Sequence, residues 1–142
     1  MHYLLGLLLA GVVHAAPLAP YQTLGTLVAG QINQQDVIWR IDTGASEVVI
    51  SQALADQLAL EVRPKQGRVA HAQGQVWAGS AWVDHLVLGP WRIPALQVWV
   101  LPGDSPHQPL WGLAGLEDLV LTLDGQQMTL EPRVGSGIMP HL

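Results

Sequence analysis

The residues best suited to carry chemistry lie together in one short segment, Asp42-Thr43-Gly44-Ala45-Ser46. Its aspartate directly follows an apolar stretch with the pattern of a β-strand, so the carboxylate starts from rigid backbone. The glycine has no Cβ, which lets the carboxylate or another main chain approach closely, and Thr43 and Ser46 add hydroxyl groups. A carboxylate held in this way can act as a general acid or base. It can also serve only to cap the turn, as in an Asx-turn.

The sequence excludes several other kinds of catalytic or binding site. It contains no cysteine, which rules out thiol catalysis, disulfide bonds and zinc–thiolate centres. Its histidines do not stand at the spacing of a metal-chelating motif, so we expect no metal site and no cofactor. No serine lies in a nucleophile-elbow pattern, and the glycines near the C-terminus lack the lysine that a P-loop requires.

Length and composition indicate one domain with an apolar core. The chain has 142 residues, of which 49% are hydrophobic and 12% charged, a composition that excludes intrinsic disorder. The net charge is -5, and the cations Arg63, Lys65 and Arg68 are typical of a solvated loop. Because no basic cluster is present, we expect no nucleic-acid partner. The six tryptophans are more typical of a core or an interface than of a carbohydrate platform.

The N-terminal segment has the pattern of a secretory signal peptide. Residues 4–13 read LLGLLLAGVV, an apolar run well short of the ~20 residues that a membrane-spanning helix needs. Small residues stand at the positions read by a signal peptidase, which predicts a signal peptide over residues 1–15 and a mature chain starting near Ala16. We therefore expect an exported protein, periplasmic or secreted. The alternative is an uncleaved segment, with residues 4–13 anchoring the protein in a membrane.

Hydrophobic periodicity predicts a mainly β fold. Apolar residues alternate with a period of two in short runs bounded by Gly, Pro, Asn or Asp, which is the pattern of β-strands. Such runs cover residues 23–32, 37–41, 48–50, 67–72, 75–88, 93–101, 120–123 and 127–130. Between two of them, Asp124-Gly125 is predicted to be the two-residue turn of a hairpin, and Gln73-Gly74 gives a weaker signal of the same kind.

Short helices complete the predicted fold. Ser51 can cap a helix whose leucines share one face, and a second apolar stripe at helical spacing covers residues 113–120. The expected fold class is therefore all-β, a small β-barrel-like domain with one or two short helices. We place this domain at residues 16–132 and expect a flexible C-terminal tail over residues 133–142.

The chain resembles the retropepsin-like aspartic proteases, the single-lobed relatives of pepsin, over residues 21–132. Within that family it is most similar to the bacterial exported or membrane-anchored members. The resemblance rests on an active-site motif, a hydrophobic-hydrophobic-glycine element and the position of a hairpin flap. These are, in that order, Asp42-Thr43-Gly44-Ala45-Ser46, Leu110-Trp111-Gly112 and Ala72-Gln73-Gly74.

This resemblance implies a retropepsin-like acid protease β-barrel and an aspartic endopeptidase acting on peptides or proteins. It assigns catalysis to Asp42 and support of the active-site loop to the four residues that follow. In the family, the threonine at the Thr43 position links two such loops by hydrogen bonds across a dimer, and the flap closes over the peptide. Trp77 and Trp82, with several Leu and Val residues, suggest apolar side chains on either side of the cleaved bond.

A single active-site motif implies that two chains are needed for catalysis. Hydrolysis requires two carboxylates facing one water, one ionised as general base and one protonated as general acid. The other six aspartates lack the strand-Asp-Thr-Gly context, so we expect a symmetric homodimer in which two Asp42 side chains meet. Because Ala45 cannot donate a side-chain hydrogen bond to the carboxylate, we expect a mildly acidic optimum, about pH 5 to 6.

Two departures from the family pattern leave a non-catalytic alternative open. Trp111 is bulkier than the usual Leu, Ile or Val, and Gly115 falls where bacterial relatives tend to have an aromatic residue. Both departures predict a looser core near the second helix and slightly favour a catalytically inactive peptide-binding or interaction module of the same fold. The complete motif from Asp42 to Ser46 favours the enzyme more strongly. A structural β-domain without a peptide ligand is a third possibility.

Overall fold

A computed structural model describes residues 18–71 and 74–142 of the chain, mostly as β-strands. The strands in chain order are β1 (Tyr21–Leu24), β2 (Leu27–Ile32), β3 (Gln35–Ile41), β4 (Val48–Ser51), β5 (Arg63–His71), β6 (Gly74–Val83), β7 (Leu86–Leu88), β8 (Trp91–Ile93), β9 (Leu96–Leu101), β10 (Leu110–Trp111), β11 (Leu119–Asp124), β12 (Gln127–Pro132) and β13 (Met139–Pro140). The helices are α2 (Gln52–Gln57) and α3 (Leu113–Leu116). The expected all-β class with short helices is confirmed.

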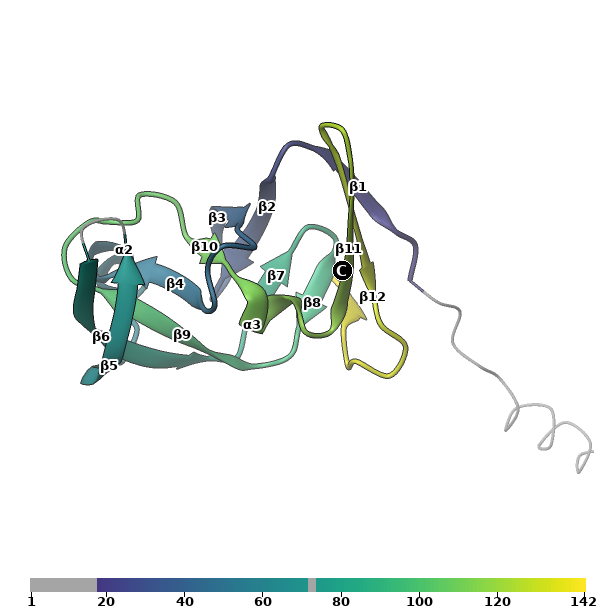
Figure 1. Cartoon of the computed structure of the whole chain (residues 1–142). Helices are drawn as coiled ribbons and strands as arrows, with labels where there is room; N and C mark the ends of the chain where they lie inside the picture. The colour runs from purple at the N-terminus through teal and green to yellow at the C-terminus, as the bar shows by residue number, and fades with distance from the viewer. Residues whose placement is uncertain (1–17, 72–73) are drawn as a thin grey trace, which may run out of the picture.

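The strands form two sheets. A ten-stranded sheet has the order β13-β8-β7-β2-β3-β10-β4-β9-β6-β5, and a three-stranded sheet has the order β1-β12-β11. Figure 1 shows the β5–β6 hairpin at one end of the molecule and the three-stranded sheet at the other. Neighbours are antiparallel except for two pairs, β10 with β3 and β4 with β9. The middle of the large sheet therefore brings the ends of β3, β10 and the start of β4 together.

Side-chain alternation explains how the central strands are held. In β3, Trp39 and Ile41 are buried while Ile38 and Arg40 face outward, as expected for a strand with one covered face. All four residues of β4 are buried, because it lies between two neighbours and is covered on both faces. The core centres on the fully buried Trp39 and Trp111 rings, which meet edge to face with centroids 4.9 Å apart.

Several predicted strands are divided in the structure. The runs predicted over residues 23–32, 75–88 and 93–101 each form two strands instead of one. The first is broken by Gly25, whose φ of +75° turns the chain between β1 and β2. Alternation continues across such breaks, so periodicity by itself does not detect them.

The hairpin turns also differ in detail from the prediction. Between β11 and β12 the paired ends are Asp124 and Gln127, so the turn consists of Gly125 and Gln126, one residue later than predicted. Gly125, with φ +60°, occupies the first central position, where a type II′ turn requires glycine.

The second predicted helix is much shorter than its apolar stripe. Only Leu113–Leu116 is helical, and Leu119 already begins β11, so the helix predicted over residues 113–120 is wrong beyond its first turn. The helix-like spacing of the leucines arises because α3 and the start of β11 each direct a leucine into the core. The first helix is confirmed, because the Ser51 hydroxyl accepts a hydrogen bond from the Leu54 N–H at 3.0 Å.

The C-terminal segment packs against the domain instead of forming the tail expected over residues 133–142. Ile138 is buried in the main core, and β13 pairs with β8 through Met139 and Arg92. Strand β13 lacks hydrophobic alternation, so it can be recognised as a strand only from its pairing with β8.

The predicted signal peptide, residues 1–15, lies outside the described residues. Within residues 18–71 and 74–142, no helix combines the length and apolar character required to cross a bilayer.

Candidate active site

Asp42 directly follows β3 at the centre of the large sheet. Its backbone N–H donates a hydrogen bond to the Trp111 carbonyl oxygen at 3.0 Å, which ties it to β10. Its side-chain Oδ1 accepts a hydrogen bond from the Gly44 N–H at 2.9 Å, and its carbonyl accepts one from the Ala45 N–H at 3.2 Å. The side chain is half-buried. These bonds fix the direction of the carboxylate while leaving it accessible to a substrate.

Gly44 makes this arrangement possible because it has no side chain. A Cβ at this position would lie 3.2 Å from Asp42 Oδ1, a tight contact that would push the carboxylate away from the N–H that holds it. The close approach expected from the sequence is therefore present. The next residues differ in exposure, with Thr43 and Ser46 exposed and Ala45 half-buried.

Another segment of the same chain holds the Asp42 loop in place through hydrogen bonds. The Leu113 N–H donates to the Ala45 carbonyl and the Ala114 N–H to the Ser46 carbonyl, both at 2.9 Å. Gly112, just before them, touches the loop so closely that an added Cβ would overlap the carbonyl oxygen of Glu47. The hydrophobic-hydrophobic-glycine element singled out from the sequence thus lies directly against the Asp42 loop.

The two departures at Trp111 and Gly115 are matched to each other. The Trp111 indole is fully buried, and its Nε1–H donates to the Gly115 carbonyl oxygen at 2.7 Å. A Cβ on Gly115 would lie 2.5 Å from Trp111 Cε2 and 2.9 Å from Val48 Cγ2, so the indole occupies the space that a side chain at position 115 would take. At this contact the two departures compensate each other, because the large Trp111 ring fills the space that the missing side chain of Gly115 leaves.

The predicted flap corresponds to the β5–β6 hairpin. Gly74 begins β6 with φ +112°, and its backbone pairs with that of His71. Ala72 and Gln73, the other two residues assigned to the flap, lie outside the described residues. The paired strands place the hairpin beside β9 in the large sheet.

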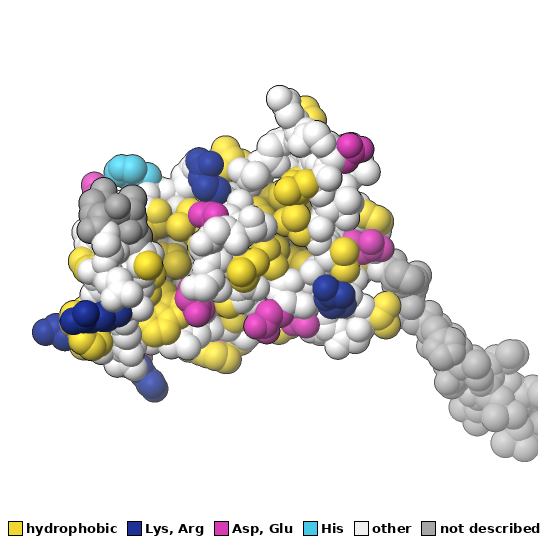
Figure 2. Space-filling view, in the orientation of Figure 1, with side chains coloured by type: hydrophobic (Ala, Val, Ile, Leu, Met, Phe, Trp, Pro, Cys, Tyr) yellow, Lys and Arg dark blue, Asp and Glu magenta, His cyan; other side chains and the backbone are white. Residues whose placement is uncertain are grey.

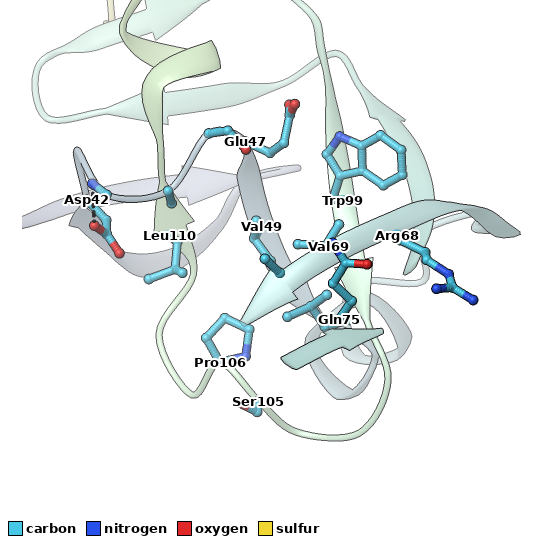
Figure 3. Close-up of a pocket in the computed structure, with 15 residues that line it drawn as sticks. Asp42, Glu47, Val49, Arg68, Val69, Gln75, Trp99, Ser105, Pro106 and Leu110 are labelled. Atoms are coloured by element: carbon cyan, nitrogen blue, oxygen red, sulfur yellow. Dashed lines mark hydrogen bonds between the residues drawn. The ribbon is translucent and has the colours of Figure 1, made fainter. Parts of the chain in front are cut away.

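A cavity of about 710 Å³ lies between the Asp42 loop, the β5–β6 hairpin and the segment before β10. Its lining includes Asp42, Val49, Val69, Trp99 and Leu110, and Figure 3 shows these side chains arranged around one hollow. In Figure 2 hydrophobic side chains are visible between the hairpin and the centre of the molecule. None of the other aspartates lines this cavity.

The tryptophan that lines the cavity is not one of the two that the sequence suggested. Trp99 lines the cavity, whereas Trp77 and Trp82 do not; Trp82 belongs to a separate cavity with Glu61 and Arg63. Sequence reasoning also missed Glu47 and Arg68, both of which line the Asp42 cavity. Neither residue belongs to a sequence motif. Their place in the cavity lining becomes clear only from the way β4, β5 and β9 are arranged in the fold.

No group of three or more His, Cys, Asp or Glu side chains suited to a metal ion occurs in the part of the chain that the structure describes. The side chains that line the Asp42 cavity offer carboxylate, hydroxyl, amide and guanidinium groups.

Comparisons with known proteins agree with this architecture. The sequence profile of the family described as "Aspartyl protease" matches residues 28–124. A crystal structure of a retropepsin-like aspartic protease from Rickettsia conorii matches with a TM-score of 0.64 and 18% sequence identity, covering 80% of this chain and 91% of that chain. A search of curated proteins finds no match. The structural likeness confirms the retropepsin-like fold expected from the sequence.

Proposed function

Because the chain belongs to the aspartyl protease family, we propose that it is an exported aspartic endopeptidase that works as a homodimer, with one Asp42 from each protomer in a shared active site. The observation that carries this proposal is the fixed position of Asp42. Its carboxylate is held by the Gly44 N–H at 2.9 Å beside a cavity of about 710 Å³.

In this mechanism the two carboxyl groups share one proton, because two like charges a few ångströms apart do not both ionise readily. The ionised Asp42 takes a proton from water as the oxygen adds to the scissile carbonyl carbon. The protonated Asp42 of the second protomer gives its proton to the carbonyl oxygen. The first Asp42 then gives its acquired proton to the amide nitrogen as the C–N bond breaks, and the second Asp42 takes a proton from a hydroxyl of the intermediate. This releases a peptide acid and a peptide amine and restores the shared proton.

The exposed surface around the catalytic loop supports the need for a partner. Thr43 is exposed beside Asp42, and Leu113 keeps 50% of its surface accessible. The second carboxylate would come with the partner's loop, and the extended substrate would lie between the loops and the β5–β6 hairpins. Main-chain hydrogen bonds to the extended peptide would supply much of its affinity.

The non-catalytic alternative loses its main support. It was favoured by the departures at Trp111 and Gly115, and these two residues pack against each other with a 2.7 Å hydrogen bond. A compact core behind the loop keeps Asp42 in a defined position, as a catalytic carboxylate requires.

The central test is cleavage of a peptide library by the mature chain, beginning near Ala16, and by Asp42→Asn. We expect the substitution to lower kcat by about 10³-fold or more, because it removes the group that exchanges protons with water and substrate. The variant keeps an oxygen that can accept the Gly44 N–H bond, so its thermal unfolding should match that of the wild type. Equal cleavage by both proteins would refute the proposal.

Export is tested separately by expressing the full chain and determining the N-terminus and location of the product. A mature protein starting near Ala16 outside the cytoplasm supports the proposed signal peptide. An intact N-terminus in the membrane fraction supports the anchored alternative, and an intact chain in the cytoplasm contradicts export.

A further inference from the structure

The cavity beside Asp42 contains a second carboxylate that the proposed mechanism does not use. Glu47, five residues further along the loop, lines this cavity and is half-buried. Its backbone is held firmly, because its carbonyl oxygen lies against Gly112 and the next residue, Val48, is fully buried in β4. The backbone from which its side chain extends is therefore held by the same packing that fixes the catalytic loop.

The cavity around Glu47 combines polar side chains such as Gln75 with an apolar portion. Val49, Trp99 and Leu110 line the same cavity, and in Figure 3 Glu47 projects on the side of Val49 that also carries Trp99. The apolar part of this lining together with the Glu47 carboxylate suits a long side chain with an aliphatic stem and a cationic end. The Trp99 ring offers a further attraction to a cation that approaches its face.

The described lining of this cavity contains one cation, Arg68. Arg68 is exposed and its guanidinium carbon lies 5.2 Å from the centre of the Trp77 ring. Figure 3 shows its guanidinium pointing away from Asp42. Asp42 and Glu47 outnumber Arg68 among the charged residues of the described lining, and the net charge of -5 over the chain adds to the attraction of basic peptides.

We propose that Glu47 makes the cleft selective for peptides with Lys or Arg close to the cleaved bond. The stem of that side chain packs on Val49 and Trp99, and its charge meets the Glu47 carboxylate. This inference rests on the proposed peptidase function. Because each protomer of a homodimer contributes one Glu47, the same preference is expected on both sides of the cleaved bond.

The test compares peptides that share one apolar cleavage site and differ at a single position. Lys, Arg, norleucine, Gln or Glu is placed at each of the three positions on either side, and kcat/KM is measured for each peptide. At the responsive position we expect Lys or Arg to exceed norleucine by about tenfold, the effect of one partly shielded ion pair. Glu47→Gln should abolish the difference, and Glu47→Lys should reverse it in favour of Glu.

Glu131→Gln is the matched control, since Glu131 is an exposed residue of β12 outside the cavity lining. This variant should keep the preference for Lys and Arg. Cleavage by the wild type without a charge preference, or a preference that survives in Glu47→Gln, would overturn the inference while leaving the peptidase function intact.

If the wild type cleaves no peptide, the proposed function fails and the role of Glu47 is tested by binding. Fluorescence anisotropy with the same labelled peptides on Asp42→Asn, with and without Glu47→Gln, separates the two questions. Tighter binding of Lys or Arg peptides that disappears with Glu47→Gln supports the role of Glu47, and equal affinities for all peptides contradict it.

Discussion

At the scale of single residues, a few short contacts define the position of the proposed catalytic carboxylate. The Asp42 carboxylate accepts a hydrogen bond from the Gly44 N–H at 2.9 Å, and the Asp42 backbone N–H donates one to the Trp111 carbonyl oxygen at 3.0 Å. The side chain of Ala45 provides no further donor. A hydrogen bond to an ionised carboxylate stabilises the charged form, so position 45 can influence the pH range of activity.

Ala45→Ser is expected to move the acidic limb of the pH–rate profile to lower pH. The added hydroxyl can donate to the carboxylate, which stays ionised as the solution becomes more acidic. The wild-type optimum is expected at about pH 5 to 6, and the measurement is kcat/KM between pH 2 and 8. A wild-type optimum below pH 3, or a profile unchanged by Ala45→Ser, would contradict this argument.

At the scale of elements, the two-residue strand β10 has a role larger than its length. It lies between β3 and β4, pairing Trp111 with Ile41 on one side and Val48 on the other. The Trp111 side chain then fills the space above Gly115 at the end of α3. This contact couples the helix to the strand that holds Asp42.

A double-mutant cycle on Trp111 and Gly115 tests this coupling. Trp111→Leu should lower the free energy of unfolding by about 2–4 kcal/mol by leaving a cavity, and Gly115→Ala by about 1–3 kcal/mol through overpacking. Together they should cost less than their sum by about 1 kcal/mol or more, since the shorter side chain leaves room for the new methyl group. Urea unfolding measures each value.

Trp82→Leu is the control for the tryptophan substitution, because Trp82 is 66% exposed and its loss should change stability by less than about 1 kcal/mol. Strict additivity of the Trp111 and Gly115 substitutions would show that the two residues do not share their space.

At the scale of the whole molecule, one chain supplies only half of the proposed catalytic pair. The described residues place one aspartate at the cavity, and the loop that carries it exposes Thr43 and lies next to the half-exposed Leu113. An active site completed by a second copy links activity to the concentration of the protein.

Specific activity is therefore expected to rise with protein concentration until the dimer saturates. Thr43→Ala should shift this rise to higher concentration, because the resemblance assigns Thr43 to hydrogen bonds between the two loops. The loss of activity should be smaller at saturating protein concentration than at low concentration. Sedimentation velocity on the same samples should show the matching change from monomer to dimer. Activity proportional to concentration in a monomeric protein would exclude the shared active site.

Much of the fold follows from the sequence because its causes are local. The period-two alternation indicates most strands, Ser51 indicates the cap of α2, and the segment after β3 indicates where a carboxylate is held on rigid backbone. These features depend on residues close together in the chain, where side-chain direction and turn geometry are set by a few dihedral angles.

The features that only the tertiary structure decided depend on residues far apart in the sequence. The pairing of β10 with β3 and β4, the burial of Ile138, and the fit of Trp111 over Gly115 arise from long-range packing that local patterns do not encode. Glu47 and Trp99 line one cavity with Asp42 because β4 and β9 pair side by side. The sequence by itself thus determined which residue is suited to the chemistry, and the packing of distant strands decided what surrounds it, because close packing is a property of the assembled core.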